Sequence, residues 1–239
     1  MKQEEDIEIL FAIESGSRAW GFPSPDSDYD VRIVYKRKLS NYLTIYPERD
    51  VIETPIVDNF DVGGWDIKKF LQHMQKSNAV TWEWMQSPVI YEEDTVLKEE
   101  LFKLSKEYFS PTSCFHHYFS MANKVKGELE GYSEIKLKKL FYILRPLLSA
   151  RWIVEFQTIP PMELEGLMNA DYIDDSSKAE IKSLVQKKAS LDEAQTINRV
   201  QVLDDFINKL LVDCEEGREK LKHVKVSDKK INAFFQGLF

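Results

Sequence analysis

The order of apolar and polar residues near the N-terminus predicts two short β-strands with a loop between them. Residues 8–13, EILFAI, form an apolar run of strand length that ends at a Ser-Gly-Ser turn signal. A second run starts at Asp28 and continues through apolar positions to Tyr35. The glycine and prolines between these runs mark a loop.

The next apolar stretch predicts a third strand and then a helix. Residues 51–62 alternate well enough for a strand, and Gly63 and Gly64 are expected to end it. Asp66 then stands where a helix N-cap is expected, because residues 67–74 carry apolar side chains at helical spacing.

The second half of the chain has a helical pattern throughout. Apolar stripes at helical spacing predict four helices, over residues 97–108, 115–129, 137–148 and 191–220. Pro146 predicts a kink or a restart in the third of these, and Ser177 with Glu180 predicts a capping box for a further helix. The change of pattern predicts a domain boundary between residues 1–95, of mixed α/β character, and residues 96–239.

The composition indicates a soluble globular protein. Hydrophobic residues make up 43% and aromatic residues 12% of the 239 residues, which excludes disorder. No apolar run approaches the roughly 20 residues that a membrane span needs, so no membrane partner is expected. The acidic start, residues 1–6, lacks the features of a signal peptide, which favours a cytoplasmic protein. Cys114 and Cys214 have no metal-ligand spacing and are expected to be thiols with no disulfide partner.

The net charge constrains the partners of the chain. At −8 it argues against a protein that coats nucleic acid by bulk electrostatics, because such binding needs clustered lysines and arginines. A local basic groove stays compatible with this charge. Many carboxylates are also compatible with a divalent metal site, although most of them must be solvated surface.

Residues 15–32, SGSRAWGFPSPDSDYDVR, carry the candidate chemistry. Side chains alternate across a strand, so Asp28 and Asp30 are expected on one side of it. Two like charges so close repel one another unless a cation lies between them. Mg²⁺ prefers oxygen ligands and is the natural cation for this pair.

A phosphate-binding turn is expected just upstream of the two aspartates. Gly16 and Ser17 lie at a strand end, where a short helix could begin with Ser17 and Arg18. Glycine lets the backbone approach closely, and the N–H groups and the serine hydroxyl are donors for phosphate. A phosphate cradle followed by two carboxylates on one face is what phosphoryl or nucleotidyl transfer needs.

These residues resemble the nucleotidyltransferase signature of the DNA polymerase beta superfamily. The signature has an apolar residue, Gly-Ser, a spacer and Asp-x-Asp among apolar residues, with ten residues here between Ser17 and Asp28. The strings GSRAWG, SDYDVR and DIKKFLQHMQKSNAVTWEWMQSP resemble predicted nucleotidyltransferases that include the RNA-ligase-associated type. The resemblance covers about the first ninety residues firmly. It implies an α+β protein: a nucleotidyltransferase fold, a small mixed sheet flanked by helices, in residues 1–95, followed by an all-helical C-terminal domain in residues 96–239.

The resemblance also implies a third carboxylate on a neighbouring strand. Asp58, Asp61 and Asp66 are the candidates. Asp61 is favoured because it lies near the end of the strand, at the family's offset from the helix that follows. Asp66 is sufficiently explained as an N-cap, but the choice between Asp61 and Asp66 stays open.

Several cations are candidates for binding the triphosphate. Arg18 and Arg32 flank the acidic motif, and Lys68 or Lys69 is next in the chain. Lys138, Tyr142 and Arg145 form a polar stripe, at i, i+4 and i+7, that could face a cleft. In the family a basic residue, a ring and an arginine recur at this spacing, and Tyr142 stands where histidine is frequent.

The expected activity is transfer of a nucleoside monophosphate from an NTP to an acceptor hydroxyl, with release of pyrophosphate. Asp28, Asp30 and Asp61 would hold two Mg²⁺ ions, and Gly16 and Ser17 would bind the phosphates. The acceptor, an RNA end, a small molecule or a protein, stays open. The alternative is an inactive nucleotide-binding regulatory or antitoxin-like module, against which the intact carboxylate pair argues.

Overall fold

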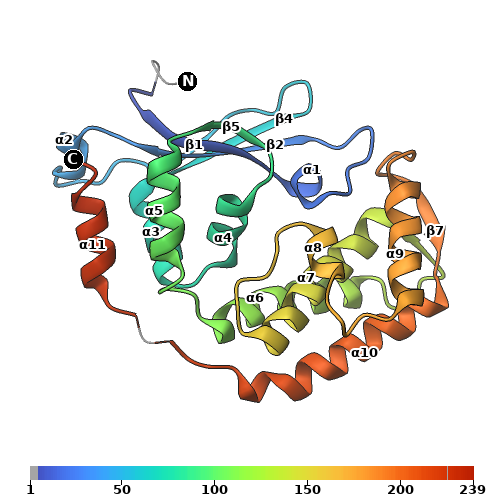
Figure 1. Ribbon diagram of the computed structural model, residues 1–239. Coiled ribbons are helices and arrows are strands. Elements are labelled where there is room, and N and C mark those ends of the chain that lie inside the picture. Colours follow the sequence, from blue (N-terminus) through green and yellow to red (C-terminus); the bar gives the residue numbers. More distant parts are fainter. Residues whose placement is uncertain (1–4, 225) are drawn as a thin grey trace. The chain divides into compact units, whose positions relative to one another are not determined.

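The computed structural model describes residues 5–224 and 226–239, and these form two compact units (Figure 1). Unit 1 comprises the described residues within Met1–Ala19, Asp28–Phe109 and Val224–Phe239, and unit 2 comprises Trp20–Ser27 and Ser110–His223. In this division, the sheet-containing part of the chain continues to Phe109 before unit 2 begins again at Ser110. Helix α5, Thr95–Ser105, packs on elements of unit 1 because its apolar side includes the fully buried Leu101.

Unit 1 is built on a five-stranded sheet in the order β3-β4-β2-β1-β5. Strand β2 is antiparallel to β1 and parallel to β4, while β3 and β5 form the two edges. The first two predicted strands are confirmed with slightly later ends. The five strands are β1 Glu8–Ser15, β2 Tyr29–Lys36, β3 Val51–Glu53, β4 Phe60–Asp66 and β5 Ile90–Glu93.

The predicted third strand was wrong in its extent, because residues 51–62 contain a chain reversal. Strands β3 and β4 pair antiparallel on either side of it, and Asp58 and Asn59 adopt positive φ values of 49° and 65°. Aspartate and asparagine tolerate this left-handed conformation better than other side chains that carry a Cβ. Gly63 and Gly64 do not end the strand but lie inside β4, opposite Arg32 and Ile33 of β2.

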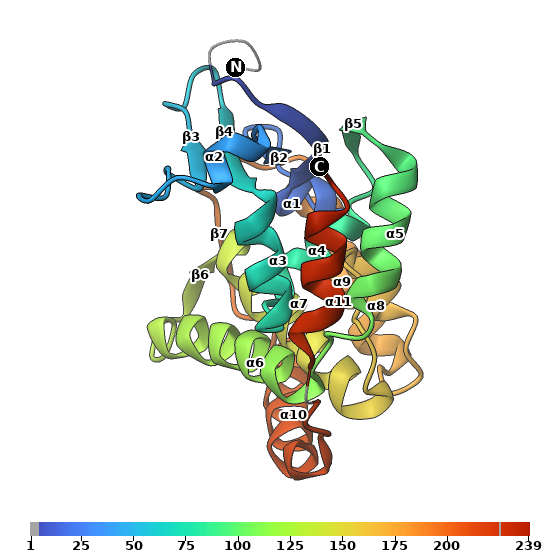
Figure 2. The same cartoon turned by 90° about the vertical axis from the view of Figure 1, so that its left-hand side faces the viewer.

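The helices that follow the sheet cover one of its faces. Figures 1 and 2 show α3, α4 and α5 together on one side of the strands. The ring of Phe70 in α3 meets that of Phe11 in β1 edge-on, with centroids 5.7 Å apart. Asp66 is the N-cap of α3, as predicted, and accepts a hydrogen bond from the backbone N–H of Lys68 at 2.8 Å. The helices of unit 1 are α1 Gly16–Trp20, α2 Leu39–Tyr42, α3 Ile67–Gln75, α4 Ala79–Gln86, α5 Thr95–Ser105 and α11 Asp228–Gln236.

Helix α11 returns to unit 1 from the far end of the chain. The hydroxyl of Tyr108 donates to the carbonyl of the helix's N-cap, Ser227, at 2.8 Å and accepts the N–H of Ile231 at 3.1 Å. Phe235 meets Tyr42 edge-on with centroids 5.3 Å apart. These contacts assign the last residues to the sheet-containing unit, which periodicity alone did not predict.

Unit 2 is mainly helical and contains one small sheet. Its long helices pack around α7, in which residues 143–150 are all buried. Pro146 does not restart this helix, which continues without interruption to Phe156. The elements are α6 Pro111–Glu128, β6 Glu134–Lys136, α7 Leu137–Phe156, α8 Leu164–Met168, α9 Asp175–Lys188, β7 Thr196–Asn198, α10 Gln201–Gly217 and the 3₁₀ helix η1 Arg218–Lys220.

Two predicted helix starts in unit 2 were wrong. Helix α9 is capped by Asp174, whose carboxylate accepts hydrogen bonds from the N–H and the hydroxyl of Ser177, both at 2.8 Å. The long helix predicted from residue 191 begins only at Gln201, because Thr196–Asn198 pairs with β6 instead. Ile197 is buried opposite Ile135, and this packing explains the strand.

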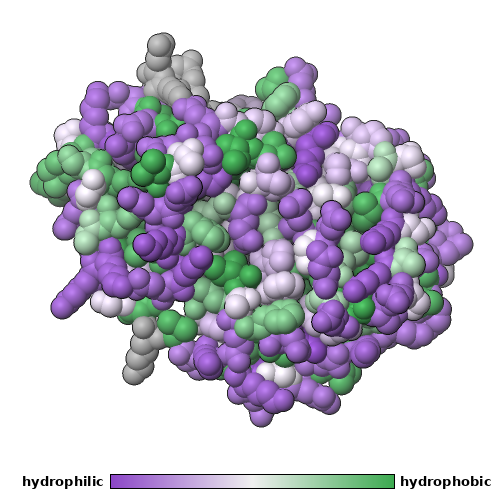
Figure 3. Space-filling view, viewed as in Figure 1, coloured by the Kyte–Doolittle hydropathy of each residue, from purple (hydrophilic) through white to green (hydrophobic). Residues whose placement is uncertain are grey.

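The overall prediction of an α+β protein is confirmed, with a five-stranded sheet and many helices. The visible surface is largely hydrophilic, with small apolar areas between charged side chains (Figure 3). Within the described part of the chain, no helix combines the length and the apolar character that crossing a membrane would need. Cys114 and Cys214 are both buried as free thiols.

Candidate active site

The Gly-Ser turn lies directly against one of the predicted aspartates. Ser15, the last residue of β1, is paired with Asp30 of β2, and Gly16 then turns the chain with a φ of +62°. A Cβ on Gly16 would lie 1.9 Å from the Oδ2 atom of Asp30, closer than any real contact. Only glycine therefore fits here, both for its backbone conformation and for the space that the carboxylate takes. Ser17 follows in the first turn of α1 and is buried.

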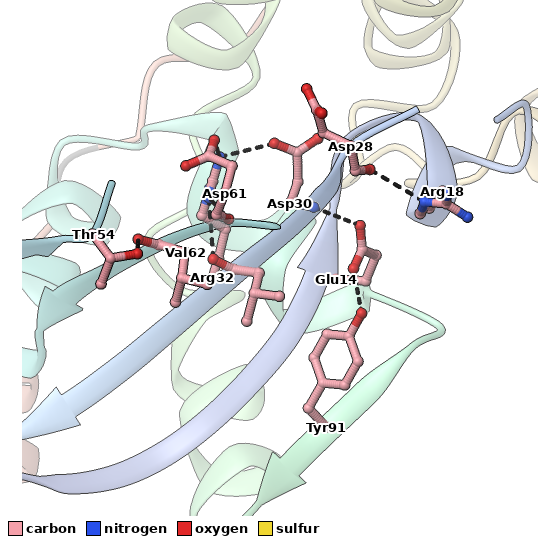
Figure 4. Close-up of polar contacts among 10 residues, drawn as sticks. Glu14, Arg18, Asp28, Asp30, Arg32, Thr54, Asp61, Val62 and Tyr91 are labelled. Carbon is pink, nitrogen blue, oxygen red and sulfur yellow. Dashed lines mark hydrogen bonds and ion pairs between the residues drawn. The ribbon is translucent and has the colours of Figure 1, made fainter. Parts of the chain in front are cut away.

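Asp30 and Asp61 are neighbours across the parallel strands β2 and β4. The register places them directly opposite one another, and Arg32 lies between their carboxylates (Figure 4). Its Nη2 atom is 3.0 Å from Oδ1 of Asp30 and 2.7 Å from Oδ2 of Asp61, and its Nη1 atom donates to the Asp61 carbonyl at 2.8 Å. The structure thus brings together three of the predicted site residues.

Asp28 lies two residues before Asp30, at the entrance to β2. Its carboxylate extends on the same side of the strand as that of Asp30, and its backbone carbonyl accepts a hydrogen bond from Nε of Arg18 at 3.2 Å (Figure 4). Burial raises the pKa of Asp30, Arg32 lowers it, and the negative charges of Asp61, Glu14 and Asp28 raise it. Asp30 is therefore the centre of a crowded group of carboxylates with Arg32 as its close cation partner.

The chemistry of this group fits a hard divalent cation. Carboxylate oxygens are the ligands that Mg²⁺ prefers, and mutual repulsion between the carboxylates is relieved by a positive charge. Asp30 and Asp61 face one another closely enough to share one guanidinium, and Asp28 is on the same side of β2. In residues 5–224 and 226–239, however, no three His, Cys, Asp or Glu side chains already converge as a metal-binding group. The two-metal role of all three aspartates stays a prediction.

Glu14 belongs to the same cluster and was missed by the sequence analysis. It is only 1% exposed, and its Oε1 accepts the backbone N–H of Asp30 at 2.8 Å. Its other carboxylate oxygen accepts the hydroxyl proton of Tyr91 (Figure 4). A buried glutamate directly before a Gly-Ser turn is unusual, because charged residues are rarely buried without a partner. In the sequence, the signal for Glu14 was its place between the apolar run of the first strand and the Gly-Ser turn.

Arg18 forms one end of a stack of planar groups beside the carboxylates. Its guanidinium carbon lies 3.9 Å from the centroid of the Tyr29 ring. Tyr29 in turn stacks on Phe60, with centroids 4.8 Å apart and an interplanar angle of 13°. Tyr29 stands between Asp28 and Asp30, and Phe60 directly precedes Asp61, so the stack is fixed to the same strand ends.

Lys68 lies at the other end of β4, away from Asp61. Asp61 and Asp66 are five residues apart in an extended strand, a separation of ~16 Å, and Lys68 is in the first turn of α3. It lines a separate cavity of about 440 Å³, together with Arg37, Asn41, Tyr42, Thr44, Pro47, Glu48, Arg49, Asp50, Asp66, Lys69 and Gln72. The structure therefore places Asp61, and not Asp66 or Lys68, beside Asp30.

Lys138 and Arg145 both lie in unit 2, where each has partners. Lys138 forms an ion pair with Glu193 and lies over the ring of Tyr142, 5.7 Å from its centroid. Arg145 is only 3% exposed; it donates from Nε to the carbonyl of Met162 at 3.0 Å and lies 4.3 Å from the centroid of the Trp20 ring. Their predicted role in binding the triphosphate stays a prediction.

Unit 2 also holds the loop that connects the Gly-Ser turn to the carboxylates. Lys188 is 2% exposed and donates from Nζ to the hydroxyl of Ser24 at 2.8 Å. Glu193 accepts the hydroxyl proton of Ser27 at 3.0 Å, and its N–H donates to the carboxylate of Asp26 at 3.0 Å. Asp26 thus connects this loop to the backbone of Glu193. The chain segment between the Gly-Ser turn and the aspartates of unit 1 therefore folds with unit 2.

A sheet that brings a Gly-Ser turn and neighbouring carboxylates together defines a nucleotidyltransferase-like protein. The chain belongs to the RNA repair pathway DNA polymerase beta family, whose profile matches residues 1–237. This confirms the resemblance that the residues 15–32 carry, and it supports an enzyme of the nucleotidyltransferase class.

A curated relative and a solved structure are among the proteins that are similar to the chain. YcgL, an uncharacterized protein of Bacillus subtilis (strain 168), is 42% identical over 226 residues, which cover 94% of this chain and 86% of YcgL. A crystal structure of a nucleotidyltransferase-like protein from Exiguobacterium sibiricum 255-15 aligns with 92% of this chain and 72% of its own. Its sequence identity is 10% and the TM-score is 0.31.

Proposed function

We propose that the protein transfers a nucleoside monophosphate from an NTP to an acceptor hydroxyl, with an RNA end as the acceptor. The observation that carries this proposal is the pair of Asp30 and Asp61, adjacent across β2 and β4, against the Gly16 turn. The membership in an RNA repair pathway family supports the choice of RNA. In the reaction, the acceptor oxygen bonds to the α-phosphorus and the bond from that phosphorus to the bridging oxygen breaks. Pyrophosphate leaves, and the hydroxyl proton passes to pyrophosphate or water.

The carboxylates would provide the metal ligands. Asp30 and Asp61, with Asp28 on the same side of β2, would hold Mg²⁺, whose charge would offset the charge that develops on the phosphates. Gly16 leaves room for a close approach to the turn, and the hydroxyl of Ser17 adds a donor for phosphate. Arg32 holds the two carboxylates in register through its 3.0 and 2.7 Å contacts. Glu14 fixes the backbone of Asp30 from the other side.

The other basic residues that were candidates for binding the triphosphate would have different roles in this proposal. Arg18 is anchored to the carbonyl of Asp28 and to the Tyr29 ring, so its charge stays at the entrance to β2. Lys68 is remote in unit 1 and is left out of the proposed site. Lys138 and Arg145 support the site indirectly, because Lys138 pairs with the Glu193 that binds the loop before Asp28, and Arg145 packs on Trp20 at its start.

A second candidate is a nucleotide-binding regulatory module without turnover. Arg32 favours it, because its guanidinium already supplies a positive charge between Asp30 and Asp61. The two candidates differ in whether Arg32 shares the carboxylates with a metal ion during a reaction. Binding of NTP without release of pyrophosphate is the behaviour that the regulatory module predicts.

Release of pyrophosphate tests the proposed function. The protein is mixed with Mg²⁺, each of the four labelled NTPs and single-stranded RNA that ends in a free 3′-hydroxyl, with a small-molecule polyol as an alternative acceptor. We expect release with at least one NTP, loss of release in EDTA, and a loss of about 10²–10³-fold or more in Asp30→Asn.

The matched control for this experiment is Asp58→Asn. Asp58 lies in the turn before Phe60, and its φ of 49° suits asparagine. It should leave release within about twofold of the wild type. Unchanged NTP binding, with no release from any NTP and either acceptor, would contradict the transferase and support the regulatory module.

A further inference from the structure

An aromatic surface lies on the face of the sheet opposite α3. Phe11 meets Phe70 of α3, so the next residue, Ala12, and its neighbour Ile33 on β2 face the other way. Alternation along β2 places Tyr29 on the same face as Ile33. Phe60 is opposite Tyr29 in the register and stacks on it.

The members of this surface are unusually exposed for large rings. Tyr29 is 37% exposed, Phe60 46% and Tyr91, on the edge strand β5, 49%. Ile56 and Val57, in the turn that leads to Phe60, are 63% and 61% exposed. The core cluster on this face consists of Ile7, Ala12, Ile33, Tyr35 and Ile52, further along the strands. Packing within the described core therefore does not explain the rings at the strand ends.

The stack has the geometry with which proteins bind bases. Arg18, Tyr29 and Phe60 form a row of planar groups at 3.9 and 4.8 Å, with the two rings nearly parallel. A base can extend such a row, because every base has a π-face, and an arginine guanidinium adds a cation–π contribution.

The position of the stack connects it to the proposed reaction. Tyr29 is flanked by Asp28 and Asp30, and Phe60 is followed by Asp61, so the rings and the carboxylates project from opposite faces of the same strand ends. A strand bound at the rings can pass over these ends and present its terminal hydroxyl to the carboxylates. The net charge of −8 argues for a contact of a few nucleotides and against a long electrostatic footprint.

We propose that Arg18, Tyr29 and Phe60 form a stacking platform that binds an unpaired end of single-stranded nucleic acid, the acceptor strand of the transfer reaction. The acceptor assignment rests on the proposed function. The binding surface itself does not, because it can be measured without NTP or Mg²⁺.

The test is the affinity of a fluorescently labelled, single-stranded eight-nucleotide RNA, measured by anisotropy without NTP or Mg²⁺. Tyr29→Ala and Phe60→Ala should each weaken binding by about 5- to 150-fold, the range that loss of one stacked base produces. Tyr29→Leu and Phe60→Leu keep apolar bulk, should preserve the fold, and should weaken binding nearly as much. Arg18→Gln should weaken binding and lower the dependence of log affinity on log salt by about one phosphate contact.

Tyr46→Ala is the matched control, because Tyr46 is a ring of the same unit that is 85% exposed and lies on the loop after α2. It should leave the affinity unchanged. Unlabelled single-stranded DNA of the same sequence should compete, while duplex RNA should not. Equal affinity in Tyr29→Leu, Phe60→Leu and Tyr46→Ala, or equal competition by duplex, would overturn the platform.

Asp30→Asn separates this inference from the proposed function. It should lower pyrophosphate release by about 10²–10³-fold or more but retain RNA affinity, since Asp30 is on the opposite face. Loss of binding in the ring variants without any turnover in the wild type would support the platform and contradict the transferase. Turnover that is unchanged in the ring variants, at RNA concentrations below saturation, would contradict the platform as the acceptor site.

Discussion

Each end of the parallel strand pair carries an aspartate, buried Asp66 at one end and half-buried Asp30 at the other, and the neighbours of the two residues differ. Asp66, at the end of β4, accepts hydrogen bonds from the Lys68 N–H and the Tyr42 hydroxyl, both at 2.8 Å. Asp30, at the start of β2, has the carboxylates of Asp61, Glu14 and Asp28 nearby. Burial is the main cause that raises the pKa of both residues.

The comparison shows that a raised pKa alone does not identify a functional acid. The surroundings of Asp66 supply donors, so its carboxyl group caps a helix start and its hydrogen-bonding capacity is used locally. The surroundings of Asp30 supply three further carboxylates against one close cation, Arg32, and this excess of negative charge is suited to an added cation. One end of the strand pair is therefore built for stability, and the other is built at the expense of stability.

The largest expected effect is on activity, and it contrasts Asp61 with Asp66. Asp61→Asn should lower pyrophosphate release by about 10²–10³-fold, because it removes a carboxylate adjacent to Asp30. Asp66→Asn keeps the cap of α3 and should leave release within about twofold of the wild type. Steady-state rates of both variants measure the contrast. Equal losses would show that Asp66 also belongs to the site and would remove the distinction between the two ends.

The second largest expected effect is on stability. Here a substitution of Asp66 should cost more than a substitution of Asp30. Asp66→Ala removes the N-cap of α3 and leaves the half-buried Tyr42 hydroxyl without its acceptor, so the free energy of unfolding should fall by about 2–3 kcal/mol. Asp30→Asn relieves repulsion and should change that free energy by less than about 0.5 kcal/mol, or raise it. Urea denaturation followed by circular dichroism measures both. A greater loss in Asp30→Asn would mean that its carboxylate is mainly structural.

The smallest expected effect is on the pH dependence of stability, which should differ between the N-cap residues Asp66 and Asp174. The folded pKa of Asp66 is raised, so the folded state holds this proton to higher pH, and the stability contribution falls as pH rises from about 3.8 through the folded pKa. Asp174 has its pKa lowered by hydrogen bonds from Ser176 and Ser177, so its contribution is present above about 3.8 and is lost on acidification.

Asparagine at each cap should therefore give opposite pH trends. Relative to the wild type, Asp66→Asn should gain stability as pH rises from 3 to 7, and Asp174→Asn should lose it. Both keep the cap geometry, because asparagine is a good N-cap residue. Urea midpoints across this range measure the trends, and parallel trends would show that the two caps have similar electrostatic surroundings.

The sequence predicted the parts of the site that depend on local chain geometry. Strand alternation was enough to place Asp28 and Asp30 on one side, and the Gly-Ser turn before them implied a close backbone approach. The adjacency of Asp61 came from the family's spacing, and the structure shows its cause in the parallel register of β2 and β4. The N-cap at Asp66 was also local and was confirmed.

What was missed depends on contacts between distant segments. Glu14 lies at the site because β1 pairs with β2, and its hydrogen-bond partner Tyr91 comes from β5. The reversal at Asp58 and the strand at Thr196–Asn198 follow from pairing partners that periodicity does not reveal. Lys138 and Arg145 form a regular helical stripe, but their partners come from residues 193 and 162 and from Trp20. Such partners are set by the tertiary fold.

The loop formed by Trp20–Ser27 has a practical consequence for dividing the chain. A fragment that ends at Phe109 would retain Gly16, the aspartates and the whole five-stranded sheet. Yet it would lose Lys188 and Glu193, to which the loop is hydrogen bonded, and it would lose α11. The polypeptide passes between the units after residues 19, 27, 109 and 223, so neither half can be excised by a single cut. Gene fusions and split reporters should accordingly be attached outside this interleaved stretch.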